Sequence, residues 1–295
     1  MAGRFGTVLT AMATPFTAQG ELDVDGVRTL AEHLLAHGTD ALVVAGTTGE
    51  SPTLSFEEKR LLWATSVDVA HAQGKQVVCG TGTYATAESI ELTKLAAETG
   101  ADGVLVVTPY YNKPPQRCLV DHFTAVAGAT SLPVVLYNIP GRTGTRIDHQ
   151  TLLTLSSVGN IVGVKDSTGD MDGVSHLLAE APAGFDVYSG DDWATFPMMS
   201  LGAAGVVSVA THVAGDRIAE MAALLDKGEL DAARRIHLSL LDVFDALFST
   251  ASPIPLKAAL EMLGLPAGPL RAPLSSATPD ERAVVETALR NAGLL

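Results

Sequence analysis

The feature that most constrains the fold is a regular alternation of short apolar runs with longer amphipathic segments along the 295-residue chain. The amphipathic segments have helical periodicity and include residues 24–37, 55–72, 87–98 and 116–127. Eight runs rich in β-branched residues have the length of buried strands, at residues 7–10, 41–45, 76–79, 103–107, 133–137, 161–164, 185–188 and 205–209. Buried strands that alternate with helices predict a parallel sheet covered by helices.

Eight parallel strands are the number that closes into a barrel, so the pattern predicts an α/β fold of the (β/α)8 TIM-barrel type. The alternative is an open, doubly wound sheet, which usually carries a Gly-x-Gly-x-x-Gly turn after its first strand. This chain has no such turn there. Helical patterns continue after the eighth run, at residues 218–225, 230–248 and 255–263. We therefore predict a barrel over residues 1–215 and a C-terminal helical extension over residues 216–295.

Charge and composition argue against several classes of partner. The formal net charge is −14, whereas binding to nucleic acid or to an anionic membrane needs a basic surface. Residues 193–215 contain no Asp, Glu, Lys or Arg and are long enough to span a membrane. Pro197, Gly202, Gly205 and His212 interrupt this segment, which predicts a buried helix, a turn and a barrel strand instead. The N-terminal residues lack a secretory signal pattern, and we expect a cytoplasmic protein.

No spacing of histidines, cysteines or carboxylates indicates a metal site. The eight histidines include no His-x-His or His-Glu-x-x-His spacing. Asp191 and Asp192 resemble a metal-binding pair only superficially, and we expect a helix N-cap and a first-turn acid there. Cys79 and Cys118 form no Cys-x-x-Cys pair and predict no disulfide framework. A metal site is therefore not expected.

Polar residues that follow the apolar runs are the candidates for catalysis, because barrel enzymes build their sites at the carboxyl ends of the strands. Among the seven lysines, only Lys165 directly follows a buried run. Burial disfavours a charged ammonium group, and a neutral amine can attack a ketone carbonyl to form an imine. The alternative is a structural lysine paired with a carboxylate, but adjacent side chains on a strand, such as Asp166, face opposite ways. Lys165 is therefore the predicted nucleophile.

Hydroxyl groups at three other strand ends indicate a proton relay around this lysine. Tyr137, Thr47 and Tyr111 each follow a different apolar run, and a hydroxyl both donates and accepts hydrogen bonds. A single Tyr or Thr at a strand end is often a satisfied core residue, whereas three around one lysine favour function. Arg142, on a Pro-Gly turn, has the fork geometry that captures a substrate carboxylate, unless it is an ordinary surface arginine. Gly190 would let a backbone carbonyl approach the substrate closely.

Around these positions the sequence resembles the dihydrodipicolinate synthase (4-hydroxy-tetrahydrodipicolinate synthase) family of the pyruvate-dependent class I aldolase superfamily. The resemblance runs from residue 5 to residue 274. One departure is Ser252, where many relatives have Asn before Pro-Ile-Pro. Six motifs in order carry the resemblance: Gly-Thr-Thr-Gly-Glu-Ser at 46–51, Val-Thr-Pro-Tyr-Tyr-Asn-Lys-Pro at 107–114, Tyr-Asn-Ile-Pro-Gly-Arg-Thr-Gly at 137–144, Val-Lys-Asp-Ser-Thr-Gly at 164–169, Ser-Gly-Asp-Asp at 189–192 and Gly-Val-Val-Ser at 205–208.

The resemblance implies a lyase of diaminopimelate and lysine biosynthesis that needs neither a metal nor an organic cofactor. It implies that Lys165 forms a Schiff base with pyruvate, whose enamine then adds to L-aspartate 4-semialdehyde. Tyr137, Thr47 and Tyr111 would form the relay, with Tyr111 contributed across a subunit interface. The family is commonly a homotetramer built as a dimer of dimers, and we expect the same assembly here.

The resemblance also implies how the substrates are held. Thr48 and the backbone at Gly190 and Val207 would hold the bound pyruvate, and Arg142 would bind the carboxylate of the semialdehyde. The nearest alternative is another aldolase of the superfamily, one that cleaves N-acetylneuraminate or a 2-keto-3-deoxy sugar acid. Arg142 in its Gly-Arg-Thr-Gly turn disfavours that reading. A catalytically idle barrel that serves as a binding protein is the other alternative, and the intact relay disfavours it.

A last expectation concerns feedback inhibition by L-lysine. In regulated relatives, lysine binds at a subunit interface through polar groups, typically His and Asn. This chain has Phe56, Lys59 and Tyr84 at such positions and retains Glu88 and Tyr110. Because the Lys59 ammonium would repel a cationic ligand, inhibition by lysine is predicted to be weak or absent.

Overall fold

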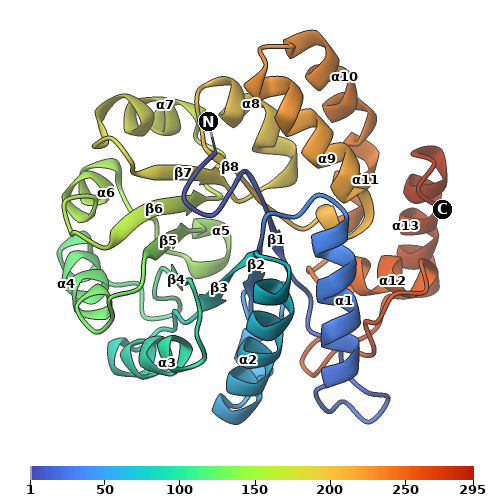
Figure 1. Ribbon diagram of the computed structural model, residues 1–295, viewed down its shortest axis with the longest axis horizontal. Coiled ribbons are helices and arrows are strands. Elements are labelled where there is room, and N and C mark those ends of the chain that lie inside the picture. Colours follow the sequence, from blue (N-terminus) through green and yellow to red (C-terminus); the bar gives the residue numbers. More distant parts are fainter. Residues whose placement is uncertain (1) are drawn as a thin grey trace.

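The structure, a computed structural model that describes residues 2–295, is a closed barrel of eight parallel strands surrounded by helices (Figure 1). Each strand pairs with the next along the chain, and β8 pairs with β1 to close the barrel. The strands are β1 (Val8–Ala11), β2 (Ala41–Val44), β3 (Gln76–Gly80), β4 (Gly103–Val107), β5 (Val134–Asn138), β6 (Ile161–Asp166), β7 (Asp186–Ser189) and β8 (Gly205–Ser208). The predicted barrel is confirmed, and every strand lies within two residues of its predicted limits.

Helices follow the strands and cover the outside of the barrel (Figure 1). Ser55 caps α2 in a capping box with Glu58, in which each side chain accepts a backbone N–H of the other. Asp25 lies in the first turn of α1, and Asp148 occupies the N-cap position of α6 without a side-chain capping bond. The barrel helices are α1 (Val24–Ala36), η1 (Ser51–Thr53), α2 (Phe56–Ala72), α3 (Thr86–Glu98), α4 (Gln116–Ala127), α5 (Pro140–Thr143), α6 (His149–Leu155), α7 (Met171–Glu180), η2 (Asp192–Ala194) and α8 (Thr195–Ser200).

The predicted C-terminal helical extension is confirmed, and it includes one helix that the sequence analysis did not anticipate. That helix begins after Thr278, which forms a capping box with Glu281, so the local signal was present. Figure 1 shows α12 and α13 packed together beside α1. The division of the chain after residue 215 stays a prediction. The helices after β8 are α9 (Thr211–Asp226), α10 (Leu230–Ser239), α11 (Leu241–Leu247), α12 (Ile254–Met262) and α13 (Pro279–Asn291).

The segment free of Asp, Glu, Lys and Arg folds as predicted. Residues 193–215 form the end of η2, α8, a turn, β8 and the start of α9. Among residues 2–295, no helix has both the length and the apolar character that a membrane crossing requires.

Closure of the barrel depends on a close approach of two backbones at the seam between β8 and β1. A Cβ atom on Gly205 would lie 1.8 Å from the carbonyl oxygen of Thr7, so glycine is needed there. All six residues of β6 and all five of β5 are buried, as expected for strands covered on both faces. These two neighbouring strands carry the candidate residues Tyr137 and Lys165.

Candidate active site

The predicted nucleophile lies beside a tyrosine of the neighbouring strand. Tyr137 on β5 and Lys165 on β6 are register partners, and the Lys165 Nζ lies 4.2 Å from the centroid of the Tyr137 ring. Both side chains are buried. Strand β6 continues through Lys165 to Asp166, whose carboxylate accepts hydrogen bonds from the hydroxyl and the backbone N–H of Thr168. The adjacent carboxylate is therefore engaged elsewhere, and the lysine faces an aromatic ring.

Burial alone does not single out Lys165, because three lysines are buried. Lys257 forms an ion pair with Glu50, with Nζ and Oε1 2.7 Å apart. Burial lowers the pKa of Lys59, and the carboxylate of Glu88 opposes that shift. Within the described residues, no carboxylate lies within ion-pair distance of the Lys165 ammonium. Lys59 likewise forms no ion pair within the described residues. What distinguishes Lys165 from the other two buried lysines is its place at the end of β6, beside the ring of Tyr137.

A cavity of about 430 Å3 opens at the carboxyl ends of β2 to β5. Thr47, Tyr137 and Arg142 line it together, so residues from the turn after β2, from β5 and from α5 share one space. The Arg142 side chain is exposed, and it makes no ion pair with any carboxylate of residues 2–295. Its guanidinium is therefore available to bind a carboxylate supplied by a ligand.

Gly190 follows β7 and packs directly against the lysine. A Cβ atom there would lie 3.1 Å from the Lys165 Cε and 2.0 Å from the Ser167 Oγ, so a larger residue would displace both side chains. The Ser167 Oγ is itself buried and lies near the carboxylate of Asp191. Sequence reasoning missed this hydroxyl. Its only signal was its place two residues after Lys165, where alternation puts both side chains on the same side of an extended chain.

Asp191 and Asp192 occupy the predicted N-cap and first-turn positions of η2, although the Asp191 side chain makes no capping bond. The Asp192 carboxylate accepts hydrogen bonds from the Ser208 hydroxyl and from the backbone N–H groups of Val209 and Ala210. Burial raises the pKa of both aspartates. The carboxylate of Asp192 thus ties η2 to the end of β8. Nowhere in residues 2–295 do three or more His, Cys, Asp or Glu side chains form a group that could hold a metal ion.

Thr47, Tyr137 and Arg142 are the predicted site residues that line this cavity; Lys165, Gly190, Thr48, Val207 and Tyr111 do not. Thr48 is buried in the turn after β2, and Val207 is buried within β8 as the register partner of Leu9. Tyr111 is 91% exposed and has a φ of 70°, a left-handed conformation that is uncommon for a bulky residue. The Tyr111 ring therefore packs on little of its own chain.

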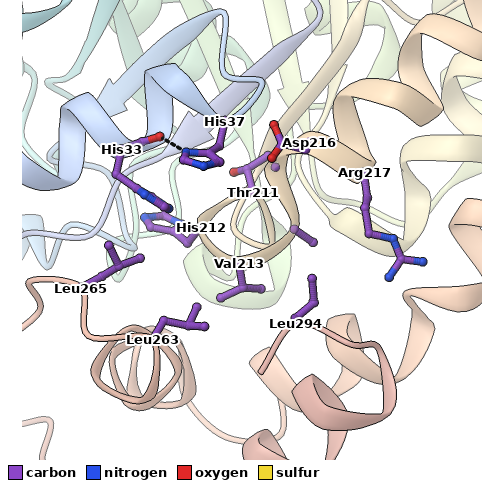
Figure 2. A pocket seen from close by; sticks show the side chains of 12 residues that line it. His33, His37, Thr211, His212, Val213, Asp216, Arg217, Leu263, Leu265 and Leu294 are labelled. Atoms are coloured by element: carbon purple, nitrogen blue, oxygen red, sulfur yellow. Dashed lines mark hydrogen bonds between the residues drawn. The ribbon is translucent and has the colours of Figure 1, made fainter.

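A second cavity, of about 270 Å3, lies between α1, α9 and the C-terminal residues (Figure 2). The His33 and His37 rings stack with their centroids 4.2 Å apart, and the His37 Nδ1 donates to the His33 carbonyl oxygen. Leu263, Leu265 and Leu294 form its apolar side (Figure 2). None of the predicted site residues lies there, so we assign the chemistry to the cavity that Tyr137 lines.

The fold and the site define the class of (β/α)8-barrel proteins that carry a buried, unpaired lysine at the carboxyl ends of the strands, an arrangement suited to imine chemistry. A profile of the dihydrodipicolinate synthetase family matches residues 4–292. The chain belongs to this family.

Relatives of the chain carry one consistent description. The chain is 50% identical over 292 residues to the 4-hydroxy-tetrahydrodipicolinate synthase of Moorella thermoacetica, which covers 99% of this chain and 100% of that protein. It is 44% identical to dihydrodipicolinate synthase from Cyanidioschyzon merolae with lysine bound, with a TM-score of 0.97 and coverage of 99% and 100%. It is also 38% identical to the chloride-inhibited enzyme from Acinetobacter baumannii complexed with pyruvate, with a TM-score of 0.95 and coverage of 98% and 99%.

Proposed function

We propose that this protein is a lyase that condenses pyruvate with L-aspartate 4-semialdehyde, the 4-hydroxy-tetrahydrodipicolinate synthase reaction of diaminopimelate and lysine biosynthesis. The observation that carries the proposal is Lys165, a buried amine at the end of β6 that has no ion-pair partner within residues 2–295. It lies beside Tyr137, which lines the cavity. The relatives support the substrates, because proteins 45% to 50% identical over nearly the whole chain bear that name. Both substrates are biosynthetic metabolites, which supports a cytoplasmic location.

The reaction proceeds through a covalent imine. The Lys165 Nζ attacks the C2 carbonyl carbon of pyruvate, and loss of water leaves the imine. Loss of a C3 proton gives an enamine, whose C3 attacks the aldehyde carbon of the semialdehyde while the aldehyde oxygen gains a proton. The amino group of the second substrate then attacks C2, which closes the ring and releases the lysine.

Each of these steps moves a proton, and the hydroxyl groups around the lysine serve that purpose. Tyr137 and Thr47 line the same cavity, and Tyr111 completes the relay from a second copy of the chain. The exposure of the Tyr111 ring supports this assignment, since burial against another subunit would give it a partner. We accordingly propose a homotetramer built as a dimer of dimers.

Different residues bind the two substrates. Thr48 and the backbone at Gly190 and Val207 hold the bound pyruvate close to the lysine. The contact between Gly190 and the Lys165 side chain supports this role. Arg142 binds the carboxylate of the semialdehyde, and its lack of an ion pair within the described chain supports that assignment.

Borohydride reduction in the presence of pyruvate tests the proposal directly. Reduction should attach a lactyl group to Lys165, and Lys165→Ala should abolish both trapping and turnover. The buried Lys59 offers a matched control, because Lys59→Ala should leave trapping intact. An adduct on any other lysine would refute the assignment. Release of pyruvate from N-acetylneuraminate or a 2-keto-3-deoxy sugar acid, without turnover of the semialdehyde, would instead favour the alternative aldolase.

A further inference from the structure

The turn that carries Thr47 and Thr48 ends in a buried carboxylate. The Glu50 side chain is 1% exposed, and its backbone has a φ of 52°, a left-handed conformation. The Glu50 N–H donates to the Thr47 carbonyl oxygen over 3.1 Å, and the Thr14 hydroxyl donates to the Gly49 carbonyl oxygen over 2.7 Å. A buried carboxylate is unfavourable without a partner. The group that neutralises Glu50 therefore also stabilises the conformation of this turn.

Lys257 of α12, in the C-terminal extension, is that partner. Its Nζ lies 2.7 Å from the Glu50 Oε1, and its side chain is 2% exposed. Burial lowers the pKa of Lys257, and both the hydrogen bond and the charge of Glu50 oppose that shift because they favour the protonated form of Lys257. The same Nζ donates to the Pro269 carbonyl oxygen over 2.9 Å and lies 4.3 Å from the centroid of the Phe16 ring.

A second residue of the extension, Arg271, contacts the same carboxylate through its backbone. The Arg271 backbone N–H donates to the Glu50 Oε2 over 2.9 Å, and its guanidinium forms a bidentate pair with Glu58. The guanidinium carbon lies 4.2 Å from the centroid of the Phe16 ring. The Phe16 N–H donates to the Ala267 carbonyl oxygen over 3.1 Å. Residues 257–271 are thus attached at several points to the loops that follow β1 and β2.

We propose that Lys257 is a positioning residue for the reaction, holding Glu50 and thereby the turn that presents the Thr47 hydroxyl to the cavity. The inference rests on the proposed function, because Thr47 matters only if a proton relay operates. Lys257 does not line the cavity and acts only through Glu50. The C-terminal extension therefore contributes to the rate of the reaction and not only to the stability of the fold.

A double-mutant cycle between Lys257 and Thr47 tests this coupling. Lys257→Met removes the charge at similar length, and Thr47→Val removes the hydroxyl at similar volume. Because a displacement of about 1 Å costs about 100-fold, Lys257→Met should lower kcat about 10- to 100-fold, with KM for pyruvate little changed. In the Thr47→Val background, Lys257→Met should cause no further loss. Wild-type kcat in Lys257→Met, or losses that multiply in the double variant, would overturn the proposal.

The controls separate positioning from general damage to the extension. Arg282→Met removes an exposed ion pair with Glu261 in the same extension and should leave kcat unchanged. If Lys257→Met fails to fold, Glu50→Gln with Lys257→Met removes both buried charges together. That variant should fold and have a lower kcat than the wild type. When Thr47→Val is added to it, kcat should fall no lower than that of Thr47→Val alone. A folded, fully active Glu50→Gln, Lys257→Met variant would reject the positioning role.

Failure of the proposed function would be visible before any variant is compared. If the unmodified protein neither traps pyruvate with borohydride nor turns over the semialdehyde, the proposed function is wrong. If it does both and the cycle shows independent losses, only the role of Lys257 is wrong.

Discussion

Tyr137 and Lys165 face each other across neighbouring strands, with the lysine ammonium 4.2 Å from the centroid of the tyrosine ring. Tyr188 is the register partner of Lys165 on the opposite side, on β7. The two tyrosines have different surroundings, because Tyr137 lines the cavity whereas the Tyr188 hydroxyl donates to the Gly6 carbonyl oxygen over 3.2 Å. Of the two hydroxyl groups, the one on Tyr137 is available to a substrate.

Removal of the Tyr137 hydroxyl should slow the reaction without unfolding the protein. One positioned proton-transfer group contributes about 100- to 10,000-fold to the rate, so Tyr137→Phe should lose kcat by about that factor. Tyr188→Phe is the matched control, because it makes the same chemical change on the other side of Lys165 and should cost stability rather than rate. Steady-state kinetics and thermal unfolding of both variants measure the difference. Wild-type turnover of Tyr137→Phe would exclude the relay.

Arg142→Ala should impair use of the semialdehyde more than imine formation with pyruvate. The carboxylate that Arg142 binds belongs to the second substrate, so KM for the semialdehyde should rise while the rate of borohydride trapping stays near that of the wild type. Arg146→Ala is the control, since the Arg146 guanidinium is already paired with Asp170. Equal damage to both steps would show that Arg142 organises the fold instead.

L-Lysine should inhibit the enzyme weakly or not at all. The cavity of about 430 Å3 is lined on one part by the residues predicted for the lysine site, namely Phe56, Lys59, Tyr84, Glu88 and Tyr110. Among them, Lys59 places an ammonium where a cationic ligand would bind. A loss of about 1.4 kcal/mol from charge repulsion weakens affinity tenfold. Titration of L-lysine into the coupled assay measures this. A dissociation constant of about a millimolar corresponds to a binding free energy of about 4 kcal/mol. Half-inhibition at a lysine concentration below about a millimolar would contradict the prediction. Lys59→His, which removes most of the charge at neutral pH, should increase sensitivity.

Acid should destabilise the protein through a buried histidine. The His212 Nε2 accepts the Ala13 N–H over 3.1 Å and its Nδ1 donates to the Val209 carbonyl oxygen over 2.8 Å, which requires the neutral ring. Burial lowers the pKa of His212 from 6.5 to about 4. Because the folded pKa is the lower one, this stabilisation is complete above pH 6.5 and is lost as the pH falls towards 4. The loss amounts to about 3 kcal/mol.

Urea unfolding at several pH values between 7 and 4 measures this dependence. His212→Gln should flatten the fall in the free energy of unfolding, whereas His176→Gln should not, because the His176 side chain is 61% exposed. Burial also lowers the pKa of His122 to about 4, so a residual slope should remain in His212→Gln. An unchanged slope in that variant would show that His212 does not titrate in this range.

Much of the fold could be predicted from the sequence because its signals are local. Runs of β-branched residues and the helical periodicity between them reflect the burial of each element separately. The limits of the eight strands could therefore be predicted to within two residues of those observed. Helix α13 was missed although the capping box at Thr278 and Glu281 was readable in the sequence. The lysine at the end of β6 was likewise found from strand position alone.

The sequence by itself determined the barrel, its helical extension and which strand ends carry polar groups, since neighbouring residues are enough to set each of these. Only the tertiary structure decided which buried lysine is paired. Lys257 has Glu50 within 2.7 Å, whereas Lys165 faces the ring of Tyr137 and has no ion-pair partner within the described residues. Ion pairs join residues that are distant along the chain, and no local pattern records such a contact before the chain has folded.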